Sequence, residues 1–562
     1  MERQWVIQRT NPEYRDYLCK VAGISPALSQ VLINRGIKTP EAVKNFLGAG
    51  ASALGNPMDS KGVPEAAEII KKAAASGKPV LVHGDYDVDG VASTSIMVGA
   101  LKAIGASPVY FIPNRFVHGY GFHKDCIELA IQHGAGLVVT TDCGITGFET
   151  AGLAKEKGLP VVITDHHEPE RGPTGCPLLP PADAVVNPKL TAGETELSGT
   201  GVAFKLAQAL MGDDALQFLD IAALGTVADL VPLVAENRSI VKAGMELIES
   251  AGRPAIKALI EIAGASGKDI TARLMSFSLV PRLNAPGRLE SASEVVAFLL
   301  CSNESEAFER ASRLDRLNKE RQRLEENTFQ DAIKKLEHLA GSAAPDSIVV
   351  AGEGWHKGVL GIVASRLAEK YGRPAIVLSI DGDYARGSGR SVPGFDLYGG
   401  LCALKEMLAG FGGHRQAAGL RISTGRIDGF REAFSSLAAA SISEYRPVLK
   451  IDSDITLKEV NFGLVKETAL LEPFGFGNPE PLFGAKELEV LSMKVVGNGH
   501  LKLRLRQGKS HLSYDAIGFD MAGSAPAIED CLLVDAAFFP MANQWEGRKT
   551  LQLNLKGIRP AV

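Results

Sequence analysis

Residues 79–90 read PVLVHGDYDVDG, an apolar run followed at once by a histidine, three aspartates at alternate positions and a glycine. Alternate residues of an extended strand point to one side, so this spacing predicts that His83, Asp85, Asp87 and Asp89 crowd one face at a strand end. Carboxylates that lie so close repel one another, which favours a positive group among them. The stretch therefore predicts a divalent metal at this strand end.

The surrounding sequence predicts a parallel sheet. From about residue 62 to 235, helix-like segments alternate with short apolar strands, the signature of parallel βαβ units. Two further strands end in polar groups, one at Asp142 in LVVTTDCG and one at His166 and His167 in VVITDHH, and Asp229 follows LGTVA. Because ligands of such sheets lie beyond the carboxyl ends of the strands, we expect these groups side by side along one rim.

The expected ligand set is rich in carboxylates, contains one or two imidazoles and has no thiolate. Such a set disfavours structural zinc and suits Mn²⁺, with Mg²⁺ as an alternative. Two ions that share a carboxylate can activate water and steady the leaving oxygen of a phosphoester. A lone aspartate after a strand is more often a helix cap, and paired histidines more often form a surface turn. Three coincident acidic strand ends favour the metal site and hydrolysis of a phosphate bond.

Composition places the chain among globular proteins with several domains. It has 562 residues, 45% hydrophobic and 22% charged, and a net charge of −5. This balance does not indicate a nucleic-acid binder, but a single strand needs only a local positive groove. The seven cysteines are scattered without a C-x-x-C pair, which predicts reduced thiols. No apolar leader or membrane-spanning stretch is found, so we expect a cytoplasmic protein without a membrane partner.

The pattern of segments predicts an α/β protein with a C-terminal barrel. The run 302–340 is charged, lacks internal Gly or Pro, and carries apolar residues at helical spacing, as expected of a long connecting helix. After about residue 446, five short strand-like segments from LEVLSMKVVG to TLQLNLKGI predict a small β-barrel. The expected divisions are an N-terminal segment (1–45), a first α/β domain (46–300), the connecting helix (301–341), a second α/β domain (342–445) and the barrel (446–562).

The same motifs carry a family resemblance. DYDVDG at 85–90, TTDCG at Asp142, the Asp-His-His triplet ending at His167 and GTVAD ending at Asp229 resemble the ordered motifs of the DHH phosphoesterases. The stretch IPNRFVHGYG around Arg115 is similar to the second motif of one branch, the RecJ single-strand-specific exonucleases. Further matches are PRLNAPGR (281–288), WHKGVLGIVASR (355–366), GSGRS (387–391) and FGGHRQAAG (411–419).

The resemblance implies a catalytic DHH domain, a connecting helix, a DHH-associated domain and an OB-fold. It implies hydrolysis of single-stranded DNA from its 5′ end to 5′ mononucleotides, with two Mn²⁺ or Mg²⁺ ions, in recombination and repair. Implied partners are single-stranded DNA, a helicase and a single-strand-binding protein, for a chain that acts as a monomer. By motif position, the metal ligands are His83, Asp87, Asp89, Asp142, His166 and Asp229, while Asp85 either binds metal or orients His83. Asp142 and His166 count as catalytic, and His167 as a contact to the phosphate or a proton donor.

Arginines suit a terminal phosphate because their donor fork matches its oxygens. The resemblance supports Arg115, Ser388 and Arg390 as the 5′-phosphate pocket. The further DNA-binding candidates in the same or similar motifs are Asn114, Arg282, Arg288 and His414. For Arg282 and Arg288 a solvated ion pair is an equal alternative, and the GGH motif of His414 alone would be an ordinary turn.

In the barrel, Lys502, Arg504 and Arg506 alternate with leucines, so the basic residues share one face. That face can follow a phosphate backbone, although alternation also leaves polar residues on any solvated face. Two other functions remain open. One is a DHH enzyme acting on short oligonucleotides, cyclic dinucleotides or pyrophosphate, and the other is a non-catalytic DNA-binding relative, which should have lost ligand motifs that are all present here.

Overall fold

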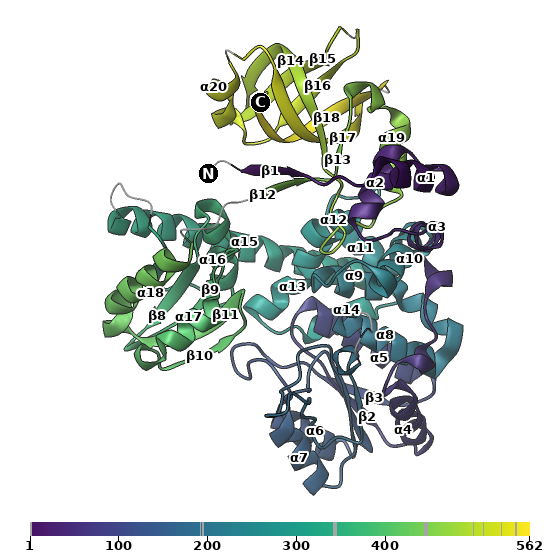
Figure 1. The fold of residues 1–562 in the computed structure, drawn as a ribbon. Coiled ribbons are helices and arrows are strands. Elements are labelled where there is room, and N and C mark those ends of the chain that lie inside the picture. The colour runs from purple at the N-terminus through teal and green to yellow at the C-terminus, as the bar shows by residue number, and fades with distance from the viewer. Residues whose placement is uncertain are drawn as a thin grey trace.

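The computed structural model describes residues 3–561 except 192, 194–195, 341–344, 443–447, 498, 510, 530 and 546–547. Two α/β bodies and a β-barrel follow one another along the chain. Figure 1 shows the long helix α15 reaching between the two α/β bodies and the barrel lying above them.

The first body is built on a parallel sheet. Its strands are β2 (Val80–His83), β3 (Pro108–Phe111), β4 (Leu137–Thr141), β5 (Val161–Thr164) and β6 (Ala184–Val186). They pair in the order β3-β2-β4-β5-β6, which confirms the predicted sheet. Strands β2, β4 and β5 are buried throughout, as their valine-rich runs require. His83 lies beside Thr140, and Thr141 beside Thr164, so the carboxyl ends of these three strands meet.

Helices cover both faces of this sheet. They are α4 (Val63–Ala75), α5 (Val88–Ala103), α6 (Lys124–Gln132), α7 (Phe148–Glu156) and α8 (Gly199–Met211). Val80 and Val82 join a core formed with α4, α5 and α8, whereas Leu81 joins one formed with α6 and α7. A helical layer follows: α9 (Leu219–Ala228), α10 (Ala235–Ala251), α11 (Pro254–Ile262), α12 (Ala272–Leu274), the π-helical turn η5 (Met275–Leu279), α13 (Val280–Leu289) and α14 (Ser293–Leu299).

The predicted connecting helix is confirmed as α15 (Glu304–Ala340), 37 residues long. It packs on α11 and α13 of the first body and on α16 of the second. The second body contains β7 (Ile348–Glu353), α16 (Leu360–Tyr371), β8 (Ala375–Asp381), β9 (Tyr384–Arg390), α17 (Leu397–Ala403), β10 (Gly410–Gly413), β11 (Ala417–Ser423) and α18 (Ile427–Ile442). Its sheet order is β10-β11-β9-β8-β7, with β7 and β8 parallel.

The C-terminal region forms a closed barrel. Its elements are β12 (Val448–Ile451), β13 (Ser453–Asp454), α19 (Phe462–Ala469), β14 (Phe483–Val496), β15 (His500–Gln507), β16 (Ser513–Gly518), α20 (Ala525–Ile528), β17 (Val534–Trp545) and β18 (Arg548–Pro560). The strands follow the order β13-β14-β15-β16-β18-β17, and β14 also pairs with β17, which closes the barrel. The five predicted strands are confirmed as β14 to β18.

The N-terminal segment packs against the barrel. It contains β1 (Gln4–Ile7), α1 (Pro12–Ala22), α2 (Pro26–Asn34) and α3 (Pro40–Leu47). β1 pairs in parallel with β12, and the buried leucines of α2 share a core with the barrel. Arg238 of α10 donates hydrogen bonds to the carbonyls of Phe46, Leu470 and Leu471. This buried arginine therefore joins the N-terminal segment, the first body and the barrel region.

Among the helices of the described residues, none combines the length and the apolar character needed to cross a membrane.

Candidate metal centre and nucleic-acid interface

The first acidic stretch does not continue its strand. β2 ends at His83 and α5 begins at Val88, so Asp85 lies in the connection, Asp87 caps the helix and Asp89 lies in its first turn. Asp87 Oδ1 accepts a hydrogen bond from the Gly90 amide at 3.1 Å. The prediction that alternation places all four side chains on one strand face is wrong, because the backbone turns after His83. The three carboxylates converge through the turn instead.

Asp89 is held by the start of a second helix. Its carboxylate accepts hydrogen bonds from the amides of Gly199 and Thr200, at 2.7 and 2.8 Å, and from the Thr200 hydroxyl. Free amides and the helix dipole at the N-terminus of α8 stabilise this anion. Burial nevertheless raises the pKa of Asp89 to about 7. Sequence analysis did not assign Gly199 and Thr200, although Ser198-Gly-Thr-Gly has the composition of a helix start.

Asp142 occupies the centre of the cluster. It follows β4 with a φ of 61°, in the left-handed region, and its side chain is buried. A Cβ at Gly199 would lie 2.4 Å from Asp142 Oδ1, so only glycine admits the carboxylate there. Burial raises the pKa of Asp142 well above its usual range, and the neighbouring carboxylates, Asp89 foremost, add to the shift. Asp142 Oδ1 lies 3.2 Å from His166 Nε2.

The ligand atoms form overlapping groups. Within the described residues, each of the following sets places its ligand atoms within 4.8 Å of one another: Asp85 with Asp87 and Asp142, Asp89 with His166 and Asp229, and Asp142 with His166 and His167. Asp142 therefore belongs to the first and the third of these sets, and His166 links it to the second, because His166 Nε2 lies 3.6 Å from Asp89 and 3.7 Å from Asp229. The structure thus brings together the acidic residues that the sequence assigned to separate strand ends.

The cluster fits divalent cations. Asp85 Oδ1, Asp142 Oδ1 and His166 Nε2 are buried and have no hydrogen-bond partner within the described part of the chain. A buried, unpartnered acceptor is unfavourable unless a cation satisfies it. Burial raises the pKa of Asp229 to about 8 and lowers that of His166 to about 3, and the neutral imidazole is the form that binds metal.

His167 has a different environment. Its Nδ1 lies 2.7 Å from Asp165 Oδ1 and 2.9 Å from the Tyr120 hydroxyl. Burial opposes a charge on His167, but the hydrogen bond with the Asp165 carboxylate prevails and raises its pKa to about 9. The same contact, against the effect of burial, lowers the pKa of Asp165. Sequence analysis did not assign roles to Asp165 and Tyr120, although an aspartate directly before two histidines was a signal for an orienting carboxylate.

His83 lies apart from the ligand groups in the described structure. Its ring is fully buried beside Phe111 and Phe122, Nδ1 lies 3.3 Å from the Cys143 sulfur, and Nε2 accepts a hydrogen bond from the His123 amide. Burial lowers its pKa to about 3. His83 ends the strand and faces the apolar core, so strand geometry separates it from the carboxylates of the turn.

A cluster of arginines lies near the metal centre. Burial lowers the pKa of Arg288 to about 10 and also lowers the pKa of Arg390, and in each case the Arg115 charge adds to the shift. Arg390 donates hydrogen bonds to the Ser388 hydroxyl and to the Gly389 carbonyl. Gly361 leaves room for both side chains, since a Cβ there would lie 3.0 Å from Arg390 Nη2. Cations gathered in this way favour an anion between them.

Two other candidates have partners within the protein. Arg282 Nε donates to Asp315 Oδ1 at 2.9 Å and ties α13 to α15, so Arg282 is in an ion pair, but a largely buried one and not the solvated pair of the alternative. Asn114 donates to the Glu290 carbonyl and accepts from the Phe116 amide, so it fixes the loop that carries Arg115.

The remaining candidates are distant in sequence from the cluster. His414 lies in an exposed turn directly after β10. Its backbone amide donates a hydrogen bond to the Ala417 carbonyl, which closes the turn. In β15, Lys502 and Arg504 are exposed and the intervening leucines are buried, as predicted. Arg506 is paired with Glu489 at 2.6 Å, and Arg504 donates to Ser513.

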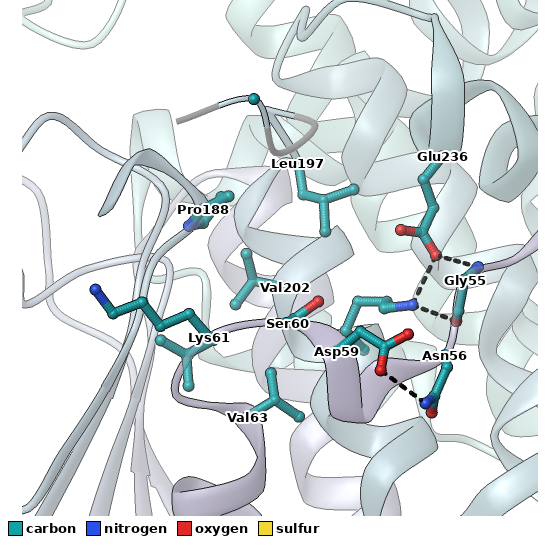
Figure 2. A pocket seen from close by; sticks show the side chains of 13 residues that line it. Gly55, Asn56, Asp59, Ser60, Lys61, Val63, Pro188, Leu197, Val202 and Glu236 are labelled. Atoms are coloured by element: carbon teal, nitrogen blue, oxygen red, sulfur yellow. Dashed lines mark hydrogen bonds and ion pairs between the residues drawn. The ribbon is translucent and has the colours of Figure 1, made fainter. Parts of the chain in front are cut away.

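A separate pocket of about 290 Å³ lies beside α8 and α10. Figure 2 shows Gly55 and Glu236 joined at its wall, and buried Lys205 donates to the Gly55 carbonyl and the Glu236 carboxylate. Because the lining of this pocket contains none of the metal-site residues, the pocket is not the candidate centre.

Comparisons with known proteins agree with this geometry. Three family models match: the DHH family N-terminal domain over residues 79–226, the DHHA1 domain over 345–440 and the RecJ OB domain over 451–557. A single-stranded-DNA-specific exonuclease RecJ from Bacillus subtilis is 36% identical over 98% of this chain and 70% of that protein. Solved structures of RecJ from Thermus thermophilus, in complex with Mn²⁺ and with Mg²⁺, match the whole chain and 80% and 79% of theirs, at 28% and 27% identity and TM-scores of 0.85 and 0.78.

Proposed function

The chain belongs to the RecJ family of single-stranded-DNA-specific exonucleases, and from that premise we propose that it removes 5′ mononucleotides from single-stranded DNA by phosphodiester hydrolysis. The observation that carries the proposal is the set of buried ligand atoms without partners, Asp142 Oδ1 and His166 Nε2 foremost. Cations bound between these two atoms, which lie 3.2 Å apart, would satisfy both of them within the core.

The proposed ligands divide into two groups. Asp89, His166 and Asp229 form one, and Asp85, Asp87 and Asp142 form the other. The 3.2 Å contact between Asp142 Oδ1 and His166 Nε2 links the two groups. Bound Mn²⁺ or Mg²⁺ would supply an activated water and charge stabilisation at the phosphate. We do not include His83 in this set, because its nitrogens contact Cys143 and His123 instead.

His167 supplies the proton chemistry in this proposal. Its Nδ1 is bound by Asp165 and Tyr120, which leaves Nε2 for the substrate. Because the Asp165 carboxylate keeps the ring cationic near neutral pH, His167 can bind a phosphate oxygen and give up a proton to the departing oxygen.

Recognition of the 5′ end of the DNA is assigned to Arg115, Ser388 and Arg390. Arg288 lies close enough for the charges of Arg115 and Arg390 to act on it. A 5′-phosphate placed among these groups relieves the repulsion between the guanidiniums and accepts their hydrogen bonds. Lys502 and Arg504 of the barrel would follow the rest of the strand, and His414 would contact a phosphate near the cleaved bond.

The wider role follows from the family. We propose that the chain acts as a monomer in the cytoplasm, in recombination and repair, on strands opened by a helicase and covered by a single-strand-binding protein. The barrel and the match to RecJ over nearly the whole chain disfavour an enzyme of short oligonucleotides or cyclic dinucleotides.

The test uses a single strand labelled at either end, incubated with Mn²⁺ or with a chelator. Mononucleotides should appear from the 5′ end only, duplex should be spared, and Asp142→Ala should abolish cleavage while binding stays measurable. Glu128→Ala, which removes an exposed carboxylate of α6, is the control and should cleave normally. Release from the 3′ end, or unchanged turnover by Asp142→Ala, would contradict the proposal.

A further inference from the structure

The turn Gly475-Phe476-Gly477-Asn478 joins the barrel region to the catalytic body. Gly475 and Asn478 exchange backbone hydrogen bonds of 2.9 and 3.1 Å across the turn. The Leu233 amide donates to the Phe476 carbonyl at 2.8 Å, so the turn lies on the segment after α9. Figure 1 shows this part of the chain descending from the barrel toward the helical layer.

Hydrogen bonds of a buried side chain fix the backbone of this turn. Asn478 is fully buried, donates to the carbonyls of Leu471 and Pro473, and accepts a hydrogen bond from Arg35. Gly477 has a φ of 74°, which glycine favours at this turn position. A Cβ at Gly477 would lie 2.9 Å from Pro232 Cβ, and one at Gly475 would lie 2.7 Å from a Leu233 methyl. Both glycines are therefore needed for the turn to lie flat on Pro232 and Leu233.

The side chain at the tip of this turn is left uncovered. Phe476 is 65% exposed. Single exposed apolar residues are common, but here the backbone beneath the ring is fixed by a buried asparagine and by two close glycine contacts. A rigid, exposed aromatic ring is the platform on which a nucleobase stacks.

The position of Phe476 agrees with such a role. Leu233 is four residues from Asp229, so their Cα atoms are at most about 14 Å apart. Leu230, directly after Asp229, has a φ of 60° and is 69% exposed, which extends the apolar surface toward the metal centre. On the barrel side, Gly475 and Arg273 line a hollow of about 410 Å³ together with Met541 and Asn554 of the barrel strands. A single strand of DNA that ran from the metal centre to the barrel would pass beside this turn.

We propose that Phe476 stacks on a base of the substrate, on the 3′ side of the cleaved bond and within its first few nucleotides. The inference rests on the proposed function, because it requires single-stranded DNA in the metal centre. Stacking is indifferent to base identity, as suits an enzyme that degrades any sequence. The turn would thus hold the strand between the metal centre and the basic face of β15.

The test measures binding of a 5′-phosphorylated single strand by the full chain in the Asp142→Ala background, where the strand is not cleaved. Phe476→Ala should weaken binding about tenfold, within the range for loss of one base–aromatic stack, and Phe476→Trp should restore it. Phe462→Ala removes an exposed phenylalanine at the start of α19 and should bind as the parent does.

Abasic substitutions at each of the first nucleotides locate the contact. With the parent, one position should weaken binding about as much as Phe476→Ala does, and at that position Phe476→Ala should show no further loss. In cleavage by the otherwise wild-type chain, Phe476→Ala should raise KM for long strands.

Two outcomes would overturn the inference. One is unchanged affinity in Phe476→Ala. The other is a loss of affinity while the variant still responds to every abasic position as the parent does, which would point to a protein partner or a packing role for the ring. Failure of the proposed function is distinguishable, because the wild-type chain would then not degrade single strands from the 5′ end at all.

Discussion

The rim of the parallel sheet and the outer face of β15 both collect charge, but they do so differently. At the rim, the carboxylates of Asp85, Asp89 and Asp142 are buried, and Asp142 Oδ1 has no hydrogen-bond partner within the described chain. On β15, Arg504 and Arg506 are exposed or half-exposed and bonded to Ser513 and Glu489. Burial without partners indicates a ligand, whereas alternation with partners is compatible with an ordinary solvated face. The rim therefore carries the stronger functional inference.

The largest expected effect is at the rim. Asp142→Asn removes the charge of the carboxylate that links the two ligand groups and keeps the shape of the side chain. Mn²⁺-dependent cleavage should therefore become undetectable while the thermal unfolding temperature does not fall. An end-label cleavage assay and a melting curve measure both. Appreciable Mn²⁺-dependent cleavage by this variant would mean that the buried rim carboxylate is not needed for catalysis, and the rim would then carry no stronger functional inference than the barrel face.

The next effect concerns the fit of Gly199 to Asp142. Gly199→Ala places a methyl against the carboxylate, so we expect Mn²⁺ affinity to fall about tenfold to a hundredfold, as when a partner of a metal ligand is lost. Titration calorimetry measures this. Gly152→Ala, at a position of α7 with open space, is the control and should bind Mn²⁺ normally.

The arginine cluster should come third. Arg390→Ala should lower the preference for a 5′-phosphate over a 5′-hydroxyl end by about tenfold to a hundredfold, because charge-assisted hydrogen bonds are lost. Competition between the two substrates gives the ratio. Arg386→Ala removes an exposed arginine from the same strand and should keep the preference. An equal change in both variants would mean that any positive charge in this region has the same effect and that the cluster does not bind the 5′-phosphate specifically.

The smallest effect is expected on the barrel. If Lys502 and Arg504 each contact a phosphate, replacing both by glutamine should lower the slope of log affinity against log salt by about 1.4. Anisotropy at several salt concentrations measures it. Lys155 and Lys157, exposed near the end of α7, provide the control pair. An unchanged slope would mean that Lys502 and Arg504 do not contact DNA phosphates and that this face of β15 is only solvated.

The sequence was sufficient to predict the strands of the sheet and the edge at which they end, but not the conformation of the turns that follow those strands. Apolar strands that end in Asp142 or His166 were sufficient for the sheet and its rim, because parallel strands place their carboxyl ends together. Alternation could not place His83, since the change from strand to helix after it depends on the capping by Asp87. The amides that hold Asp89 come from a helix more than a hundred residues away, a contact set by tertiary packing.

The central claim is that two cations bind between carboxylates and His166 at this rim. The most direct measurement is anomalous scattering from a crystal of the full chain grown with Mn²⁺. We predict two peaks, one within the group of Asp89, His166 and Asp229 and one within the group of Asp85 and Asp87, with Asp142 contacting both. Peaks elsewhere, or none at the rim with these side chains turned apart, would contradict the account.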